Sequence, residues 1–149
     1  MNKQERLHTI KQSNRKRLLQ RLLLALPAGL AVYFLMRTDG NIWIGFTIIG
    51  GVLLATRYFF SNEAEAISQL SEQEQVKRVV TLQYHLDFLF IALLGLVNPL
   101  AIRIMEWSWI PTVLIGGALL YIFWAQEKLD QQIRWLDPEQ PTRREIRRF

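Results

Sequence analysis

The chain has 149 residues, half of them hydrophobic, and a formal net charge of +5 at pH 7. Its mean hydropathy is only +0.09, so the apolar residues must be gathered into blocks between polar stretches. The sequence contains no cysteine, which excludes disulfides, thiolate metal sites and thiol catalysis. Its two histidines, His8 and His85, are too few for a histidine metal cluster.

Four apolar runs predict four transmembrane helices. The first run has about 19 residues, close to the roughly 20 that cross the hydrocarbon core of a bilayer. Turn-forming residues at 38–41 predict a tight connection to the second span. Pro27 is expected to kink the first span. The predicted spans are 18–36, 42–60, 86–104 and 107–125.

The polar segment between the second and third spans contains two helix starts. Asn62 with Glu65 fits a capping box, which predicts a short helix that ends near Leu70. Ser71 with Glu74 fits a second capping box, which predicts a helix that continues into the third span. These pieces are interpreted as cytoplasmic helical extensions that pack together in a small bundle.

The last helix is expected to continue beyond its span as far as Leu136. Asp137 precedes Pro138, and the residue before a proline disfavours the helical conformation, so the helix should stop there. Thr142 with Glu145 can cap one more basic turn within the tail at 137–149. This tail suits either the inner membrane surface or simple disorder.

The basic residues predict the orientation in the membrane. Of the 18 Lys and Arg residues, 14 lie before the first span, between the second and third spans, or after the fourth, and Arg21 and Arg57 lie at the span ends next to these segments. Only Arg37 and Arg103 lie at the two short connections. The positive-inside rule therefore places both termini in the cytoplasm of a plasma or inner membrane. The basic clusters are expected to lie beside anionic lipid of the inner leaflet and not to bind nucleic acid.

An internal repeat organises the predicted spans. The twelve residues that start at Trp43 recur from Trp109, with seven identities at a constant offset of 66 (109 − 43). Two apolar helices share aligned leucines by chance because both are rich in leucine. A shared Trp-Ile at the same distance before a Gly-Gly pair is not explained by composition in this way. The offset also pairs Gly29 with Gly95, Arg37 with Arg103, Ile67 with Ile133, Leu70 with Leu136, and Ser71 with Asp137.

The repeat predicts an all-α membrane protein of two tandem helical hairpins. The first hairpin covers 1–70, the second covers 71–136, and a basic cytoplasmic tail covers 137–149. Each copy holds two spans, so both copies enter the membrane from the same side. The repeat is therefore of the parallel kind, with an axis near the membrane normal.

Small residues predict a helix-packing face. Thr47, Gly51 and Ala55 recur every four residues and lay small side chains along one face of the second span. Such a face lets another helix backbone approach closely. We interpret it as a packing surface and not as a ligand groove. The glycines of the repeat, Gly50, Gly116 and Gly117, are assigned to the same role.

Few polar groups lie within the spans. The offset of 66 pairs Arg21 with Asp87, and the two are expected to form an intramembrane ion pair, because charges at such depth need a partner. Arg57 is the rival partner for Asp87, and a carboxylate that reaches out to interfacial water is the alternative. Asn98 is a candidate polar residue, and beside Pro99 it is expected to satisfy loosened backbone.

The sequence lacks the motifs of common enzymes and of phosphate-binding sites. It has no glycine-rich phosphate loop, Ser-His-Asp set or His-Glu-x-x-His metal site. We therefore expect no enzymatic activity, cofactor or metal. The expected role is an accessory, assembly or immunity-type protein that binds another membrane protein. A homo-oligomeric pore of the holin type, formed by self-association, and a small carrier are the alternatives.

Overall fold

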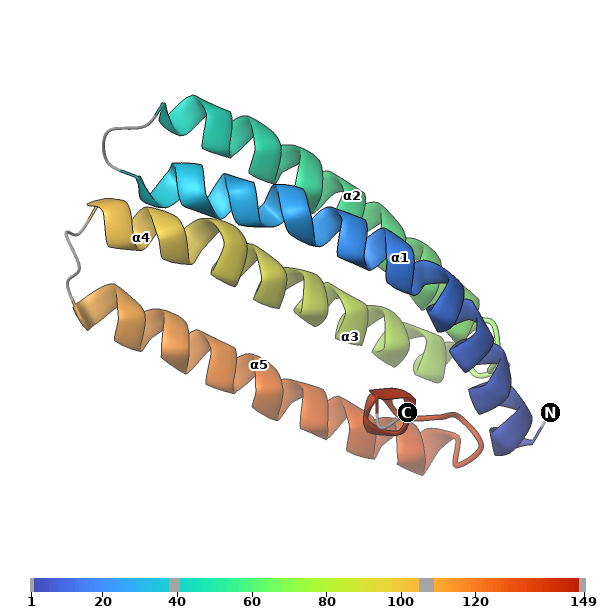
Figure 1. Cartoon of the computed structure of the whole chain (residues 1–149). Coiled ribbons are helices and arrows are strands. Elements are labelled where there is room, and N and C mark those ends of the chain that lie inside the picture. Colours follow the sequence, from blue (N-terminus) through green and yellow to red (C-terminus); the bar gives the residue numbers. More distant parts are fainter. Residues whose placement is uncertain (1, 38–40, 105–108, 148–149) are drawn as a thin grey trace.

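The computed structural model describes residues 2–37, 41–104 and 109–147, without the side chains of residues 13–21 and 147 (Figure 1). All regular elements of this part are helical, which confirms the predicted all-α class. They are α1 (Lys3–Met36), α2 (Ile42–Ser68), α3 (Glu74–Ala92), the π-helical turn η1 (Leu93–Val97), α4 (Asn98–Ile104), α5 (Trp109–Leu136) and α6 (Arg143–Arg147).

Three stretches of helix are long and apolar enough to cross a membrane. They are Ile42–Ser68, the continuous Glu74–Ile104 and Trp109–Leu136. The described part of α1 contributes a shorter apolar stretch, Leu22–Met36. Helix α1 runs through Pro27 without a break.

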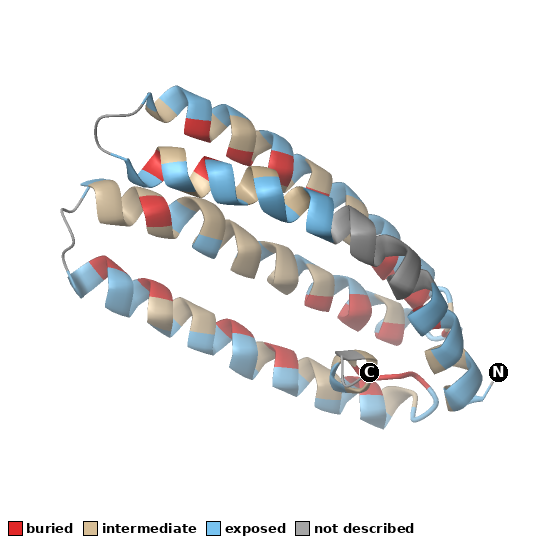
Figure 2. Ribbon diagram, in the orientation of Figure 1, coloured by how far each residue is buried: buried red, intermediate tan, exposed pale blue. Residues whose placement is uncertain are grey.

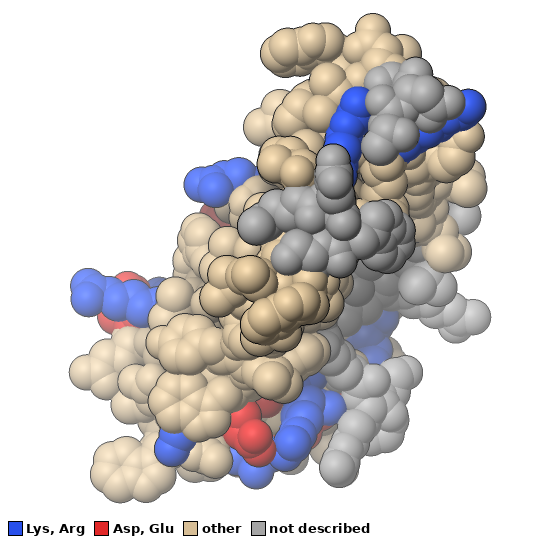
Figure 3. All heavy atoms as spheres, turned by 90° about the vertical axis from the view of Figure 1, so that its left-hand side faces the viewer, with Lys and Arg blue, Asp and Glu red and all other residues tan. Residues whose placement is uncertain are grey.

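The long helices lie side by side and alternate in direction (Figure 1). Helix α2 packs against α1 and α3, and α5 packs against α3 and α4. One end of the bundle, called here the polar end, holds the start of α1, the turn between α2 and α3, and the C-terminal segment at 137–147. The opposite end, the loop end, which faces the viewer in Figure 3, holds the end of α1, the start of α2, the end of α4 and the start of α5.

Helices α1 and α2 approach most tightly near the loop end. A Cβ added to Gly45 would lie 2.9 Å from Cγ and 3.1 Å from the backbone nitrogen of Leu35. Leu35 is fully buried in an apolar cluster that includes Ala31 and Ile49. Figure 2 shows that buried residues lie on the faces that the helices turn toward one another. A glycine at position 45 is therefore what allows this hairpin to close.

A second apolar cluster lies at the polar end. It joins five helices, because Ile10, Ile67, Val76 and Ile133 are buried together and Ile146 of α6 packs against them. Burial of this kind stabilises the end of the bundle by roughly 1.5–3 kcal/mol for each large aliphatic side chain. It holds the C-terminal segment close to the start of α1.

The π-helical turn lies directly before Pro99. Proline has no N–H, so the carbonyl four residues earlier loses its usual partner and collides with the proline ring. The chain widens there, and the backbone N–H of Asn98 donates to the carbonyl of Leu93, five residues back. Prolines and π-helical turns are both recognised sites of kinks in helices.

The predicted helix starts after the second span were wrong in detail. Asn62 does not begin a new helix, because α2 continues through it to Ser68. Glu63 and Ile67 are buried in the bundle, so tertiary packing outweighs the local capping signal. Helix α3 begins at Glu74, later than the capping box at Ser71 indicated.

Candidate functional site

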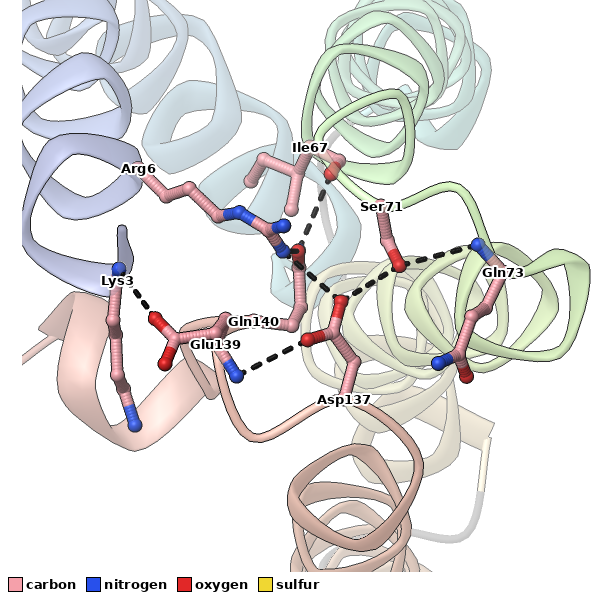
Figure 4. Close-up of polar contacts among 8 residues, drawn as sticks. All are labelled: Lys3, Arg6, Ile67, Ser71, Gln73, Asp137, Glu139 and Gln140. Carbon is pink, nitrogen blue, oxygen red and sulfur yellow. Dashed lines mark hydrogen bonds and ion pairs between the residues drawn. The ribbon is translucent and has the colours of Figure 1, made fainter. Parts of the chain in front are cut away.

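Asp137 is the centre of a polar network at the polar end (Figure 4). Its Oδ2 accepts a hydrogen bond from the Ser71 hydroxyl at 2.8 Å and from the Arg6 guanidinium at 3.0 Å. Its Oδ1 accepts from the backbone N–H of Glu139 at 3.1 Å. Since α5 ends at Leu136 as predicted, the carboxylate joins the end of α5, the turn after α2 and the start of α1.

The C-terminal segment folds back onto the bundle and does not extend as a tail. Gln140 is 0% exposed, accepts from Arg6 at 3.0 Å and donates to the Ile67 carbonyl at 3.3 Å. Lys3 donates its backbone N–H to Glu139 at 2.7 Å and its ammonium to Glu145 at 2.9 Å. The segment therefore fastens the first turn of α1 to the last turn of α2.

The predicted last helical turn is present as α6. The backbone N–H of Thr142 donates to the Glu145 carboxylate at 2.9 Å, as the capping pattern indicated. Partial burial opposes ionisation of Glu145, but this N–H and the ammonium of Lys3 outweigh it and lower its pKa. Burial likewise opposes ionisation of Asp137, while the hydrogen bonds from Ser71 and Arg6 and the charge of Arg6 lower its pKa. Both carboxylates are held in their charged forms.

A reciprocal set of hydrogen bonds joins α3 to α5. Gln83 of α3 donates to Asp130 of α5 at 2.8 Å, and Gln126 of α5 donates to Asp87 of α3 at 2.9 Å. Each helix presents a glutamine followed four residues later by an aspartate, and the helices are antiparallel, so each amide meets the other carboxylate. We call these four residues the Gln/Asp ladder.

Arg143 attaches α6 to both carboxylates of the Gln/Asp ladder. Its guanidinium forms an ion pair with Asp87, and its backbone N–H donates to Asp130 at 3.1 Å. The side chains of Asp87 and Arg143 are only 14% and 15% exposed. A buried ion pair of this kind needs further hydrogen bonds to offset the loss of hydration, and Gln126 supplies one.

A cavity of about 630 Å³ lies beside this cluster, between α1, α2, α3 and the C-terminal segment. Toward the loop end its wall is mainly apolar, with Leu24 and Ala28 from α1, Val52 from α2 and Ile91 from α3. The volume is within the usual range for small-molecule sites.

The wall nearer the polar end carries charged and polar groups. Glu63, Gln83, Asp87 and Arg143 line the cavity there. The Glu63 residue is only 2% exposed. Acidic and basic groups thus lie between the apolar wall toward the loop end and apolar residues still closer to the polar end, which include Ile67 and Val80.

The predicted ion pair has one member outside the described side chains. The side chain of Arg21 belongs to the undescribed stretch 13–21, so the Arg21–Asp87 pair stays a prediction. The rival partner Arg57 lies over the Phe88 ring, 5.8 Å from its centroid. Asn98 is half-buried beside the π-helical turn.

The predicted packing face is exposed in the isolated chain. Thr47 and Gly51 are exposed and Ala55 is half-buried. A Cβ added to any of four glycines would meet no heavy atom within 4 Å; these are Gly50, Gly51, Gly116 and Gly117. Within the part of the chain that the structure describes, these glycines are therefore not used for close packing between helices.

Comparison with protein-family models, curated proteins and solved structures gives no match to this chain. Within the described residues, no group of three His, Asp or Glu side chains is placed to hold a metal ion. The Gln/Asp ladder and Arg143 were not predicted. A signal for the ladder was present, because Gln83 and Gln126 each stand four residues before an aspartate in mainly apolar helices.

Proposed function

We propose that this protein is a non-enzymatic accessory or assembly protein of the inner membrane that binds another membrane protein. In this proposal α1 supplies a fourth span, in addition to the three long apolar stretches. Its apolar part, Leu22–Met36, lies alongside the loop-end half of α2, and basic residues precede it. With four spans, the polar end and both termini face the cytoplasm, in accord with the distribution of Lys and Arg.

The proposal includes the origin of the fold from two tandem hairpins. Helices α2 and α5 begin 67 residues apart (109 − 42) and end 68 apart (136 − 68). Four of the five buried residues of α5 follow a buried residue of α2 by 66 positions. These pairs are Gly45 with Pro111, Ile49 with Ile115, Thr56 with Ile122, and Ile67 with Ile133. Equivalent positions thus share the same burial, which supports the repeat beyond shared composition.

The observation that carries the proposed role is the open surface around the glycine pairs of α2 and α5. Exposed apolar side chains alone would only indicate a surface that contacts lipid, with no need for a protein partner. Glycine gives no apolar area to lipid and weakens a helix by about 0.5–1 kcal/mol relative to alanine, so unused pairs at equivalent positions need another reason. Close approach by a helix of a second protein supplies that reason.

The test is purification of the tagged protein from its native membrane in mild detergent, followed by mass spectrometry. We expect one membrane protein at near-equal amount with the wild type. Gly51→Leu and Gly117→Leu should each lower its recovery by about tenfold or more, since a bulky side chain blocks close helix contact. Gly29→Leu is the matched control, because a Cβ at Gly29 also meets nothing within 4 Å but the residue lies on α1.

Equal recovery of the partner with Gly51→Leu and Gly29→Leu would contradict the role of the glycine pairs. Recovery of the protein only as a homo-oligomer would contradict the accessory role. That second result would favour the pore, which then needs conductance measurements in planar bilayers.

A further inference from the structure

A second, smaller cavity of about 280 Å³ lies between α2 and α3, and we call it the α2/α3 groove. Phe60 and Tyr84 line both this groove and the cavity beside the Gln/Asp ladder, and the centroids of their rings are 5.8 Å apart. This aromatic pair therefore separates the two cavities. The polar and charged side chains of the groove include Arg57, Ser61 and Glu65 of α2 and Thr81 and His85 of α3.

Arg57 brings a positive charge to the groove that no carboxylate of the described residues pairs with. Its guanidinium lies over the Phe88 ring, 5.8 Å from the centroid, and this ring contact is its one polar interaction within the described part of the chain. A contact with a ring face does not use the N–H donors of a guanidinium. Ser61 follows Arg57 by four residues, so its hydroxyl lies on the same face of α2. The groove thus offers donors to an anion.

The acidic member of the groove lies at its other end. Glu65 follows Arg57 by eight residues, which is about 12 Å along α2. It is exposed to solvent and accepts a long hydrogen bond from Gln69 at 3.4 Å. Exposed charges at such a separation are largely screened at physiological salt. The end of the groove at Arg57 is therefore the end that attracts a negative group.

In the four-span arrangement, this end lies at the inner boundary of the hydrocarbon core. Ser61 directly follows the span 42–60, and His85 directly precedes the span 86–104. Arg57 lies three residues inside the second span, and its long side chain is able to reach the interface. Lipid phosphates lie just outside the hydrocarbon core. Basic pockets between membrane helices on the cytoplasmic side are known to bind lipid head groups.

We propose that the α2/α3 groove binds the phosphodiester of one glycerophospholipid of the inner leaflet. The guanidinium of Arg57 and the hydroxyl of Ser61 donate hydrogen bonds to the phosphate oxygens, and the acyl chains extend past Phe88 into the bilayer. This inference rests on the membrane location in the proposed function, but not on the protein partner.

The test is native mass spectrometry of the full chain after delipidation and incubation with equal amounts of dioleoyl-phosphatidylglycerol and dioleoylglycerol, which has the same chains without a phosphate. We expect one bound phosphatidylglycerol, preferred by about tenfold or more, as charge-assisted hydrogen bonds provide. Arg57→Gln should lower its binding by about tenfold. Arg78→Gln is the matched control, because it removes the same charge from an exposed position of α3 outside the groove wall and should keep the wild-type ratio.

Equal binding of the two lipids by the wild type would overturn the recognition of a phosphate. Equal binding of phosphatidylglycerol by Arg57→Gln and Arg78→Gln would overturn the assignment of the groove. Millimolar inorganic phosphate should leave the lipid bound, and its displacement would assign the site to free phosphate and overturn the lipid. If Arg57→Gln lacks the thermal unfolding transition of the wild type, Arg57→Lys is judged in its place. It keeps the charge but loses the planar donor fork, so we expect a partial loss.

Failure of this proposal is separable from failure of the proposed function. Gly51→Leu should keep the lipid while it loses the protein partner. Recovery of the tagged protein in the soluble fraction of its cells would contradict the membrane location, and it is measured independently of the lipid ratio.

Discussion

The hydroxyl of Ser71 donates a hydrogen bond to the carboxylate of Asp137, and these two residues are 66 positions apart, the spacing of the sequence repeat. In the proposed arrangement of two tandem hairpins, Ser71 and Asp137 are equivalent positions, and they are in direct contact at the polar end. Each follows a long helix, α2 or α5, so the contact joins the ends of these two helices.

This contact predicts a cross-link. The natural chain has no cysteine, so Ser71→Cys with Asp137→Cys gives a single defined pair. We expect oxidation to form an intramolecular disulfide in most molecules, seen as a mobility shift that a reductant reverses. Ser71→Cys with Trp135→Cys is the control, since Trp135 is 89% exposed. A cross-link of equal yield in the control pair would argue against a specific contact.

Acid is expected to weaken the polar end. Since the folded-state pKa of Asp137 is lowered by Ser71 and Arg6, against the effect of burial, its contribution to stability is present above the unfolded pKa. It is lost as the pH falls below about 3.9 and passes through the folded pKa. We expect Asp137→Asn to lower the free energy of unfolding by about 1–3 kcal/mol at pH 7 and by less at pH 3.

The measurement is thermal unfolding in detergent from pH 7 to pH 3. Glu72→Gln is the control, because Glu72 is an exposed carboxylate next to Ser71, in the turn between α2 and α3. A wild-type advantage over Asp137→Asn that stays constant over this range would show that the carboxylate charge does not matter.

Gly45 and Gly51 are expected to respond to alanine in opposite directions. At Gly45 the new Cβ would lie 2.9 Å from Leu35 Cγ and 3.1 Å from its backbone nitrogen, so the hairpin must open slightly. Overpacking of this kind costs about 1–3 kcal/mol. At Gly51 no atom lies within 4 Å, so alanine should raise helix stability by about 0.5–1 kcal/mol. Thermal unfolding of the two variants in the same detergent compares them directly.

The Gln/Asp ladder should behave as a coupled unit. Gln126→Leu removes the amide that donates to Asp87 and leaves a buried charge with one hydrogen bond fewer. We expect a loss of about 1–3 kcal/mol, and a smaller further loss when Gln83→Leu is added. A double-mutant cycle measured by thermal unfolding gives the coupling. Exactly additive losses, with Thr81→Ala as an exposed control on α3, would mean that the two hydrogen bonds act separately.

The proposed orientation predicts which cysteines react from outside the cell. Asn41→Cys, exposed at the loop end, should react with a membrane-impermeant maleimide in intact cells. Gln75→Cys, exposed at the polar end, should react only after the membrane is broken. The reverse pattern would place both termini outside and would contradict the positive-inside interpretation.

The helices could be predicted from the sequence because the length and hydropathy of each apolar run depend on neighbouring residues only. The stop at Leu136 followed from Asp137 and Pro138 for the same reason. The contacts between helices could not be predicted in this way. Asn62 carries a sound local capping signal, yet the buried Glu63 beside it keeps α2 continuous.

The site residues show the same division. Asp87 was selected because a charge in an apolar helix is costly, but its contact with Arg143 depends on how a segment 56 residues away folds back. The glycine pairs were recognised from their spacing, while their lack of neighbours within the chain depends on how the helices turn. Contacts such as that of Asp87 with Arg143 depend on the path of a terminal segment, and that path depends on tertiary packing.

The C-terminal segment has a consequence for the order of synthesis. Lys3 and Arg6 contact four residues of this segment across separations of 131 to 142 residues; these are Asp137, Glu139, Gln140 and Glu145. When synthesis has just passed the end of α5, these contacts still lack their second half, because residues 137–145 have not yet been made. The start of α1 must therefore wait through the synthesis of more than 130 further residues before its binding site exists.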